Sequence, residues 1–343
     1  MSTTNSLICF GELMIRLGTE GFERFVQANK FEIKFTGAEA NVGISCASFG
    51  MPSYAVSMVP AHDIGQACIN YLRRFGINTD YIQRGGDRLG ILYTETGCSQ
   101  RPSKVIYDRA NSSFTQLTIG EEQWENILSG HSWFHFCGTA PAQGEIAYNT
   151  LIIGLKVAKK LGLTISCDYN YRKKLWSQKE AQSKMEKLME YVDIGIGNEE
   201  DCEAVFGVKA QGSDYQSGSI DSESYSIVAK KMVHKYGLKA QAITLRESIS
   251  ASTNGWSAII SDGQNCWKSK HYTVELVDRI GGGDSFTGGL IYSLATGKDY
   301  QEAIEFASAA SCIKQTIPGD FNLSTREEVD ELVNGNASGR VQR

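Results

Sequence analysis

Residues 278–286 read Asp278-Arg279-Ile280-Gly281-Gly282-Gly283-Asp284-Ser285-Phe286, and an apolar pattern with helical spacing begins at the second aspartate. Three consecutive glycines leave the start of that helix without side chains. Its main-chain N–H groups and the positive end of its dipole are therefore open to an anion such as phosphate. The Asp284 carboxylate could accept a proton from an attacking hydroxyl group while the amides stabilise a phosphoryl group. This stretch indicates a kinase, although an ordinary turn with an aspartate cap would read the same.

The composition is typical of a folded globular protein. Hydrophobic residues make up 41% of the 343, with 35 glycines and 5 prolines, which is unlike a disordered or fibrous chain. The net charge of -5 argues against nucleic-acid binding, which needs a basic face. No basic leader precedes an apolar run, and no stretch approaches about 18 uninterrupted apolar residues. We therefore expect a cytoplasmic protein with no nucleic-acid partner and no membrane span.

The nine cysteines stand far apart and form no Cys-x-x-Cys pair. Most lie inside apolar stretches, so we interpret them as buried thiols in a reducing compartment rather than as a disulfide framework or a metal site. They are Cys9, Cys46, Cys68, Cys98, Cys137, Cys167, Cys202, Cys266 and Cys312.

Short apolar runs alternate with amphipathic segments along most of the chain. This alternation predicts a layered α/β domain with a mostly parallel sheet. The expected buried strands are residues 7–10, 54–59, 133–137, 163–167, 192–196 and 241–245. The expected helices are residues 38–49, 64–75, 145–161, 179–191 and 223–236, followed by one from Asp284 to the stop at Gly297 and another containing 303–313.

Two segments interrupt this rhythm. Residues 12–36 and 87–115 carry short alternating runs, such as Phe31-Glu32-Ile33-Lys34-Phe35, which predict a small inserted sheet that could cover a pocket. We divide the chain into an α/β domain of residues 1–11, 37–86 and 116–335, a β-sheet lid of residues 12–36 and 87–115, and a flexible tail of residues 336–343. The serine-rich stretch 213–226 is expected to be a loop that leads into a helix.

Polar residues follow several of the expected strands. In an open α/β sheet, ligands bind beyond the carboxyl ends of the strands, so these residues mark the expected binding edge. They are Gly11-Glu12, Gly138-Thr139, Asp168-Tyr169-Asn170-Tyr171-Arg172, Gly197-Asn198-Glu199-Glu200-Asp201 and Arg246-Glu247-Ser248. We expect the sets at 168–172 and 197–201 to converge on one rim.

The usual nucleotide-binding signatures are absent. The chain has no Gly-x-x-x-x-Gly-Lys-[Ser/Thr], no complete Gly-x-Gly-x-x-Gly after a strand, and no His-Arg-Asp or Asp-Phe-Gly. It also lacks His-Glu-x-x-His and Gly-x-Ser-x-Gly. We therefore exclude a Walker-type NTPase and a protein kinase, and we disfavour a zincin and an α/β-hydrolase.

Three motifs resemble those of the ribokinase or pfkB-type carbohydrate kinases, and the likeness runs over nearly the whole chain. They are Thr36-Gly37-Ala38-Glu39-Ala40-Asn41, Asn198-Glu199-Glu200-Asp201 and the stretch from Asp278 to Asp284. The resemblance implies a ribokinase-like three-layer α/β/α domain with a mostly parallel sheet and a small inserted β-sheet lid. It also implies that Asp284 is the catalytic base, and that the anion hole is formed by the amides of Gly281, Gly282, Gly283 and Asp284.

The resemblance further implies ATP as phosphoryl donor and Mg²⁺ as cofactor. Asn198 and Asp201 match an Asn-x-x-Glu element that helps to hold Mg²⁺ with the nucleotide phosphates, often through water. The aspartate at 201 is shorter than the usual glutamate, which reduces its reach. Thr36 stands where the early motif usually has a first glycine, which alters one backbone approach to the sugar.

Two arginines favour an acidic substrate. Arg172 follows an expected strand, and Arg109 lies in the expected lid. An arginine can bind a carboxylate through two parallel charged hydrogen bonds, which a neutral sugar does not require. A lone arginine is usually a solvated surface residue, and Arg109 taken alone could equally be one.

Within the family, the chain is most similar to the 2-keto-3-deoxygluconate kinases, through residues 37–41, Tyr93, Tyr107-Asp108-Arg109, Asn170-Tyr171-Arg172 and residues 316–322. The similarity implies a set of substrate contacts: Gly37, Ala38, Glu39, Asn41, Tyr93, Tyr107, Arg109, Arg172 and Asp284. It implies a set of nucleotide contacts: Asn170, Arg172, Asn198, Arg246, Gly281 and Gly283. Residues 246–248 depart from the glycine-containing turn of these kinases.

Because family members often pair through their lid sheets, a homodimer is also expected.

We therefore expect ATP-dependent phosphorylation of the terminal hydroxyl of 2-keto-3-deoxygluconate or a close keto-acid. Two alternatives remain open. One is a kinase of a neutral sugar such as fructose or ribose. The other is a sugar- or nucleotide-binding regulator without catalysis. The retained Asp284 and the intact glycine run argue against this second alternative.

Overall fold

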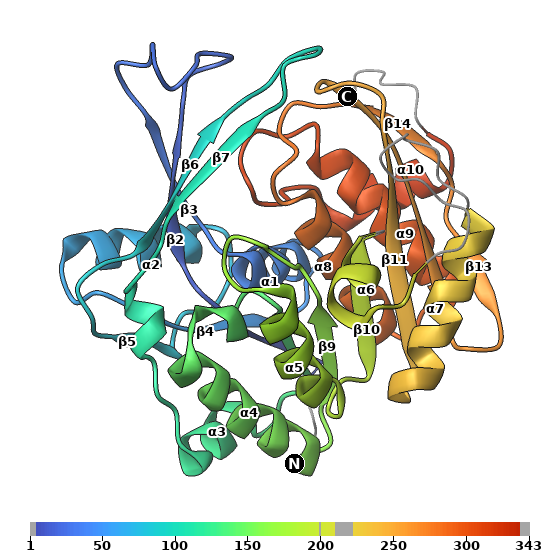
Figure 1. Ribbon diagram of the computed structural model, residues 1–343, viewed down its shortest axis with the longest axis horizontal. Helices are drawn as coiled ribbons and strands as arrows, with labels where there is room; N and C mark the ends of the chain where they lie inside the picture. The colour runs from blue at the N-terminus through green and yellow to red at the C-terminus, as the bar shows by residue number, and fades with distance from the viewer. Residues whose placement is uncertain (1–4, 199, 210–221, 337–343) are drawn as a thin grey trace.

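The computed structural model describes residues 5–198, 200–209 and 222–336, which form two β-sheets (Figure 1). The larger sheet has the strand order β13 (Cys266–Lys268), β12 (Thr253–Ser261), β11 (Ala240–Ser248), β10 (Ile194–Asn198), β9 (Thr164–Asp168), β8 (Trp133–Cys137), β1 (Leu7–Phe10), β4 (Ser53–Val59) and β5 (Ile82–Arg84), and β14 (Tyr272–Glu275) pairs with β12. Neighbours from β11 to β5 are parallel, whereas β12, β13 and β14 pair in antiparallel fashion. The mostly parallel sheet predicted from the sequence is confirmed.

The end of β11 differs from the expectation. The apolar pattern predicts that the strand stops before Arg246, but β11 continues to Ser248, and its last three residues pair with residues 254–256 of β12. These three residues are exposed, so ladder hydrogen bonds rather than burial extend the strand. A hydrophobic pattern cannot reveal an extension of this kind. Strands β12, β13 and β14 were not predicted either; β13 and β14 are short and partly exposed, whereas β12 is buried and was missed.

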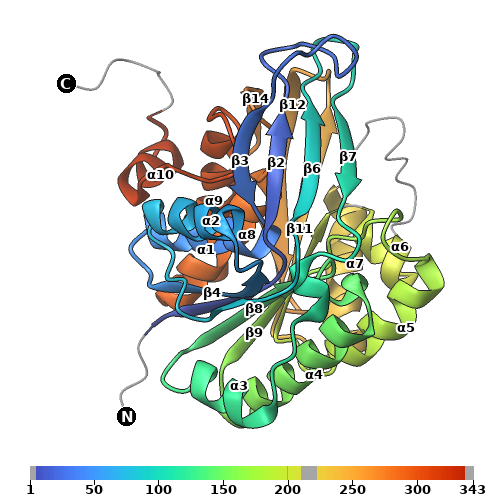
Figure 2. The same ribbon diagram turned by 90° about the vertical axis from the view of Figure 1, so that its left-hand side faces the viewer.

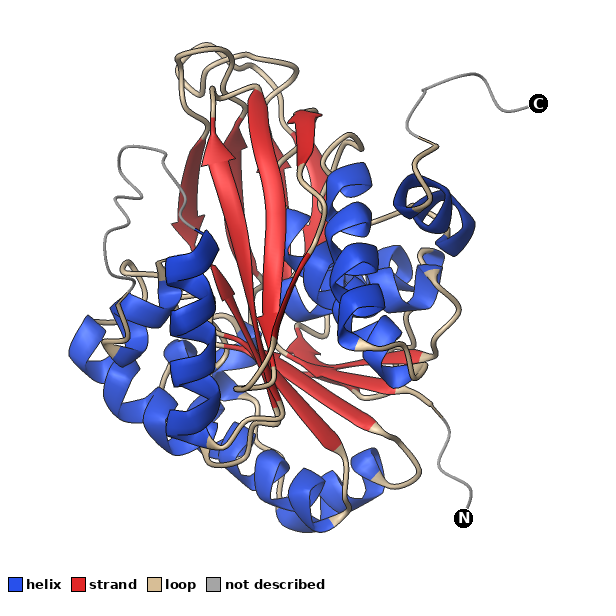
Figure 3. Ribbon diagram, turned by 90° about the vertical axis from the view of Figure 1, so that its right-hand side faces the viewer, coloured by secondary structure: helices blue, strands red, loops and turns tan. Residues whose placement is uncertain are grey.

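Helices cover both faces of the larger sheet and complete the predicted three layers (Figure 3). One face carries α3 (Glu121–Leu128), α4 (Glu145–Lys160), α5 (Gln178–Met189), α6 (Asp201–Phe206) and α7 (Ser222–Tyr236), which share a buried core with the strands. The other face carries α1 (Ala38–Ser48), α2 (Asp63–Arg74), α8 (Gly282–Ala295) and α9 (Tyr300–Lys314), with α10 (Arg326–Val333) against α9. Two short 3₁₀ turns lie at Ser113–Gln116 and Pro141–Gln143.

The helices predicted between the strands are all present, with ends close to those expected. The helix after the glycine run begins at Gly282 rather than at Asp284, so Gly282, Gly283 and Asp284 form its first turn. Helices α3, α6 and α10 were not predicted. They have 8, 6 and 8 residues, which is too short for an apolar period to be recognised.

The second sheet, which we call the lid sheet, stands beside the carboxyl edge of the larger one (Figure 2). Its strand order is β3 (Glu32–Thr36), β2 (Met14–Gly18), β6 (Gly90–Glu95) and β7 (Lys104–Asp108). Arg16, Leu92 and Tyr107 lie opposite one another and therefore share one face, whereas Tyr93 and Ile106 share the other. The small separate sheet expected from residues 12–36 and 87–115 is confirmed.

The cysteines are all free, and six of the nine are buried. The prediction of buried thiols is wrong for Cys98, which is exposed because it lies in the turn between β6 and β7, and Cys266 and Cys312 are only partly buried. Within the described ranges, no group of three or more His, Cys, Asp or Glu side chains could hold a metal ion, and no helix is long and apolar enough to cross a membrane. Residues 213–221 and the expected tail after residue 336 lie outside the described residues.

Candidate active site

A pocket of about 450 Å³ lies between the lid sheet and the carboxyl edge of the larger sheet. Of the residues predicted for the site, those that line it are Ala38, Glu39, Asn41, Tyr107, Arg109, Asn170, Arg172, Asn198, Asp201, Arg246, Gly281, Gly282, Gly283 and Asp284. The N–H of Tyr171 donates to Asp201 Oδ1 at 3.1 Å, so the residues after β9 and β10 meet on one rim as predicted.

The glycine run forms the first turn of α8 and leaves its amides open. Gly281 has a φ of 81°, in the left-handed region that favours glycine, and a Cβ there would lie 1.9 Å from the carbonyl oxygen of Asp320. A Cβ on Gly283 would meet nothing within 4 Å. Among the described residues, the N–H groups of Gly283 and Asp284 find no acceptor. These two amides and the helix dipole together provide an anion site.

Asp284 lies at the inner end of this anion site and is held by Asn41. Nδ2 of Asn41 donates to Asp284 Oδ2 at 2.6 Å, and Asn41 Oδ1 accepts from the Thr36 hydroxyl at 3.3 Å. Burial raises the pKa of Asp284 to about 6, and the bond from Asn41 opposes this shift. A carboxylate with that pKa is mostly ionised at neutral pH and is still basic enough to take a proton, which suits a general base.

Arg109 reaches the pocket already paired with an acidic residue. Its Nε donates to Glu12 Oε2 at 2.9 Å, its Nη2 donates to the same oxygen, and both side chains are buried. The Arg109 guanidinium also lies over the Tyr107 ring, 5.5 Å from its centroid. Glu12 Oε1 has no hydrogen-bond partner in the part of the chain that the structure describes. This end of the pocket therefore offers an acceptor oxygen rather than an uncompensated positive charge.

Arg172 is in the opposite situation. Its side chain is exposed at the pocket, and its Nη1 donates to the carbonyl oxygen of Tyr171 at 3.2 Å. It makes no ion pair with any residue that the structure describes. Of the two arginines that suggested an acidic ligand, Arg172 is the one available to a substrate carboxylate.

Glu39 lies deeper than the other predicted substrate contacts. It is 2% exposed, and its Oε1 accepts from the N–H of Cys137 at 3.1 Å and from its thiol at 2.8 Å. Burial raises the pKa of Glu39 to about 7. Because a Cβ on Gly11 would overlap this carboxyl group, glycine is required directly after β1. Glu39 therefore joins the start of α1 to the end of β8 beneath the pocket.

Asn198 and Asp201 hold each other in a tight turn after β10. Asn198 Oδ1 accepts from the N–H groups of Glu200 at 2.8 Å and of Asp201 at 3.0 Å. Asp201 Oδ2 accepts from the N–H of Asn198 at 3.1 Å, and its other oxygen accepts from Tyr171. Since these oxygens already accept main-chain hydrogen bonds, the pair fits a Mg²⁺ ion that is reached through water rather than bound directly.

Two further arginines line the same pocket. Arg246 is near the end of β11, and Arg279, for which the sequence suggested no role, precedes the glycine run by two residues. Burial lowers the pKa of Arg279, and repulsion from Arg246 lowers it further. Two like charges near the anion site favour an anionic ligand there. Asn170 lies on the β9 rim with a φ of 38°.

Two of the predicted substrate contacts do not line the pocket. Leu92 occupies the inner face of the lid sheet, so its neighbour Tyr93 lies on the outer face, where its ring packs edge-on against Phe31 with 6.0 Å between centroids. Direct substrate contact by Tyr93 does not fit this position. Gly37 precedes α1, and a Cβ there would lie 2.4 Å from the carbonyl oxygen of Glu12. Its role is therefore to allow this close approach of two main chains.

Three acidic residues of the pocket were not assigned to it from the sequence: Glu12, Asp168 and Asp320. Glu12 and Asp168 did carry a signal, since both belong to the polar sets expected at the carboxyl edge. Burial raises the pKa of Asp168 well above its ordinary value. Asp320 lies within residues 316–322, which were noted for their similarity to the kinases, but no role was given to it, because its partner Arg16 is 304 residues away in the chain.

Comparisons with known proteins identify the family. The family model for pfkB family carbohydrate kinases matches residues 4–325. The solved 2-dehydro-3-deoxygluconokinase of Thermotoga maritima is 45% identical, with a TM-score of 0.92 over 96% of this chain and 100% of its own. The 2-dehydro-3-deoxygalactonokinase of Haloferax volcanii is 29% identical over 98% of this chain and 99% of its own. A putative ribokinase II of Escherichia coli, solved with ATP and Mg²⁺, shares the fold at 19% identity, with a TM-score of 0.78 over 96% of this chain and 99% of its own.

Proposed function

The chain belongs to the pfkB family of carbohydrate kinases, and we propose that it transfers the γ-phosphoryl group of ATP to the terminal hydroxyl of 2-keto-3-deoxygluconate or a closely related keto-acid. One observation carries the proposal: a single pocket holds Asp284 at the open start of α8 and also Arg172, which has no ion pair among the described residues. The first residue suits proton abstraction, and the second suits a carboxylate.

In the proposed reaction, Asp284 takes the proton from the substrate hydroxyl as the oxygen attacks the γ-phosphorus. The new P–O bond forms as the bond to the β-phosphate oxygen breaks, and ADP leaves with the electron pair. Asn41 keeps the Asp284 carboxylate oriented through the bond at 2.6 Å. The open amides of Gly283 and Asp284 stabilise the charge on the transferred group.

The donor side of the pocket fits a nucleotide with its metal ion. Arg246 and Arg279 line the pocket and would bind the phosphates of ATP, and Asn198 and Asp201 would hold Mg²⁺ through water. Mg²⁺, when bound, neutralises phosphate charge during transfer. We place the reaction in the cytoplasm, since all nine cysteines are free thiols.

The names of two relatives bear on the substrate. The Thermotoga maritima protein is named for the gluconate-derived acid and the Haloferax volcanii protein for the galactonate-derived acid, which differ in the configuration of one hydroxyl group. Both are keto-sugar acids, in agreement with the role proposed for Arg172. We favour the gluconate-derived acid because the first relative is the more similar at 45% identity.

We further propose that the lid sheet closes over the sugar and that its outer face pairs with a second copy of this chain. Phe31, Ile33 and Ile106 are 38%, 62% and 51% exposed on or beside that face, which leaves an apolar surface for a partner. Light scattering of the purified protein should give a dimer, and Ile33→Glu should shift it toward the monomer. A monomeric wild-type protein would contradict the pairing.

A coupled ADP-release assay tests the proposed activity. The panel contains 2-keto-3-deoxygluconate, its galactonate-derived epimer, fructose and ribose. We expect the highest kcat/KM for one of the two acids. A preference for fructose or ribose would show a neutral-sugar kinase, and no turnover with any sugar would support a binding protein without catalysis.

A further inference from the structure

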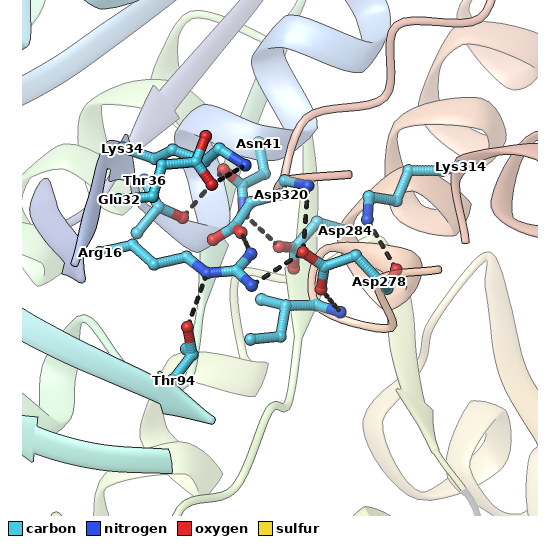
Figure 4. A network of polar contacts seen from close by, with 12 residues as sticks. Arg16, Glu32, Lys34, Thr36, Asn41, Thr94, Asp278, Asp284, Lys314 and Asp320 are labelled. Carbon is cyan, nitrogen blue, oxygen red and sulfur yellow. Dashed lines mark hydrogen bonds and ion pairs between the residues drawn. The ribbon is translucent and has the colours of Figure 1, made fainter. Parts of the chain in front are cut away.

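Arg16 of β2 crosses from the lid sheet to the loops beside the catalytic residues (Figure 4). Its Nη2 lies 2.8 Å from Asp278 Oδ2, its Nη1 donates to Asp320 Oδ1, and its Nε donates to the Thr94 hydroxyl at 3.1 Å. Arg16 is 6% exposed. One buried guanidinium of the lid sheet therefore binds two carboxylates of the larger domain at once.

Asp278 shapes the glycine loop. Its Oδ1 accepts from the N–H of Ile280 at 3.1 Å, and its Oδ2 accepts from the N–H of Gly319 at 3.0 Å. Its carbonyl oxygen accepts from the Lys314 ammonium at 2.9 Å. The entry to residues 281–284 is thus fastened to the loop after α9 through this aspartate.

Asp320 touches the glycine loop from the other side. Its carbonyl oxygen lies against Gly281, where a Cβ would be 1.9 Å away. Its Oδ2 is buried without a hydrogen-bond partner among the described residues, while Oδ1 binds Arg16. Arg16 therefore binds the two aspartates between which the start of α8 is held.

We propose that Arg16 is a positioning residue that gives the Gly281–Asp284 loop its catalytic shape only when the lid sheet is closed. Opening the lid sheet removes the guanidinium from Asp278 and Asp320 together. The closing motion then completes the anion site and the base at the moment when the substrate is enclosed. The expected change in kcat rests on the proposed kinase function, whereas the expected change in the order of the loop does not.

Arg16 also affects Asp284 through electrostatics, because Asp320, which Arg16 binds, is close enough to influence the ionisation of Asp284. Groups that face Asp284 are Glu39 on α1, Asp168 at the end of β9, Arg172 on the following loop, Lys314 on α9 and Asp320 on the loop after α9. Asp320 is among the groups that raise the pKa of Asp284. Without Arg16, the Asp320 charge is less compensated, so the base becomes harder to ionise.

An arginine suits this position better than a lysine. The planar guanidinium presents several N–H groups in fixed directions and can serve two carboxylates and a hydroxyl together, whereas an ammonium acts as a single point charge. Arg16→Lys should therefore keep the charge and lose the double contact, and Arg16→Gln should lose both.

The test compares Arg16→Gln and Arg16→Lys with the control Arg101→Gln. Arg101 is also an arginine of the lid region. Its Nη1 donates to Glu95 at 3.0 Å and its Nη2 to the carbonyl oxygen of Phe22 at 2.9 Å, and both of these partners lie within the lid segments. Steady-state kinetics on the sugar that the wild-type protein uses best gives kcat, KM and the pH profile. Hydrogen–deuterium exchange of residues 278–286 and 316–322, without ligands, reports loop order independently of activity.

We expect Arg16→Gln to lower kcat by roughly 10- to 100-fold, since small misplacements of reacting groups have effects of that size. Its KM should change far less, its acid limb should move to higher pH, and both peptides should exchange faster. Arg16→Lys should fall between Arg16→Gln and the wild type, and Arg101→Gln should match the wild type. If Arg16→Gln does not fold, Arg16→Lys and Thr94→Val provide the same comparison.

Unchanged exchange with an unchanged kcat would overturn the proposal, and so would a raised KM at normal kcat. If the wild-type protein turned over no sugar, the proposed function would fail, while faster exchange in Arg16→Gln would still support the structural role of Arg16.

Discussion

The glycine loop and the lid sheet border the same pocket, but they are stabilised by different kinds of contact. The turn at residues 281–285 is closed by a short-range main-chain bond from the N–H of Ser285 to the Gly281 carbonyl at 2.8 Å, and Asp278 at its start provides the contact with Arg16. The lid sheet is joined to the larger domain by the buried ion pairs of Arg16 with Asp278 and Asp320, and a further buried pair, Arg109 with Glu12, links the two lid segments to each other.

The glycine loop therefore carries the reacting groups, whereas the lid sheet influences when and how well they are positioned. The loop carries the base and the anion site within a few consecutive residues, so a change there should remove turnover and leave binding and folding intact. The ion pairs of the lid sheet carry no reacting group, so changes there should act on turnover only indirectly, through stability, closure and the shape of the loop. Mutations in the two regions should therefore have different effects.

Asp284→Asn should lower kcat by roughly 10³-fold or more, near the upper range for a general base, because an amide cannot take the hydroxyl proton. Substrate affinity should be largely kept, since Asn41 can still bond to the side chain at this position. Coupled ADP release gives kcat, and calorimetry with the sugar alone gives Kd. A variant with near-normal turnover would remove Asp284 from the mechanism.

Glu12→Gln should destabilise the protein by roughly 3 kcal/mol, because it leaves the buried Arg109 guanidinium without its counter-charge. The free energy of unfolding is measured by urea denaturation. The matched control is Asp108→Asn, which breaks an exposed pair with Arg88 at 3.0 Å and should change the stability far less, because solvent screens that pair. Equal losses in the two variants would contradict the structural role given to the buried pair.

Arg172→Ala should raise the KM for the acidic sugar by roughly 10- to 100-fold, the range expected for a lost charge-assisted hydrogen bond. Turnover of a neutral sugar, where it can be detected, should change little. Initial rates over a range of substrate concentrations provide both values. An unchanged KM for the acid would mean that its carboxylate is bound elsewhere, and would refute this part of the proposal.

The pH dependence of kcat should show an acid limb near pH 6. Burial raises the pKa of Asp284 to about 6, so the base is ionised above that pH and becomes protonated below it. Turnover should therefore fall about tenfold per pH unit on the acid side. Residual turnover of Asp284→Asn should lack this limb. A wild-type profile that stays flat down to pH 4.5 would disagree with the assignment.

Tyr93→Phe should change the KM for the sugar less than about twofold, because its ring lies on the outer face of the lid sheet. Tyr107→Phe is the matched comparison, since Tyr107 lies on the inner face and lines the pocket. A larger effect at Tyr93 than at Tyr107 would show that the faces of the lid sheet are used differently from this account.

The anion site at the glycine loop could be predicted from the sequence because it depends only on a few consecutive residues. Consecutive glycines before a helix expose amides wherever they occur, so residues 281–284 were recognised without knowledge of the fold. The strands of the parallel core were predictable for a similar reason, because each is a short apolar run, as in residues 133–137 of β8.

The contacts of the lid sheet could not be predicted in this way. The partners Arg16 and Asp320 are 304 residues apart, and Arg109 and Glu12 are 97 apart, so no spacing rule links them. Arg109 was expected to be available to the substrate, and only the structure shows that Glu12 neutralises it. Tyr93 was expected to contact the substrate because the resemblance named the residue, whereas the register of β6 places its side chain on the outer face of the lid sheet.

The most direct test of the central claim is ³¹P NMR of a reaction that contains the purified protein, Mg·ATP and 2-keto-3-deoxygluconate. We expect a phosphomonoester signal to appear as ATP is converted to ADP. The signal should be coupled to the protons of the terminal carbon of the sugar acid and should be absent with Asp284→Asn. Conversion of ATP without a phosphomonoester of the acid, or phosphorylation of fructose or ribose in preference to it, would contradict the account.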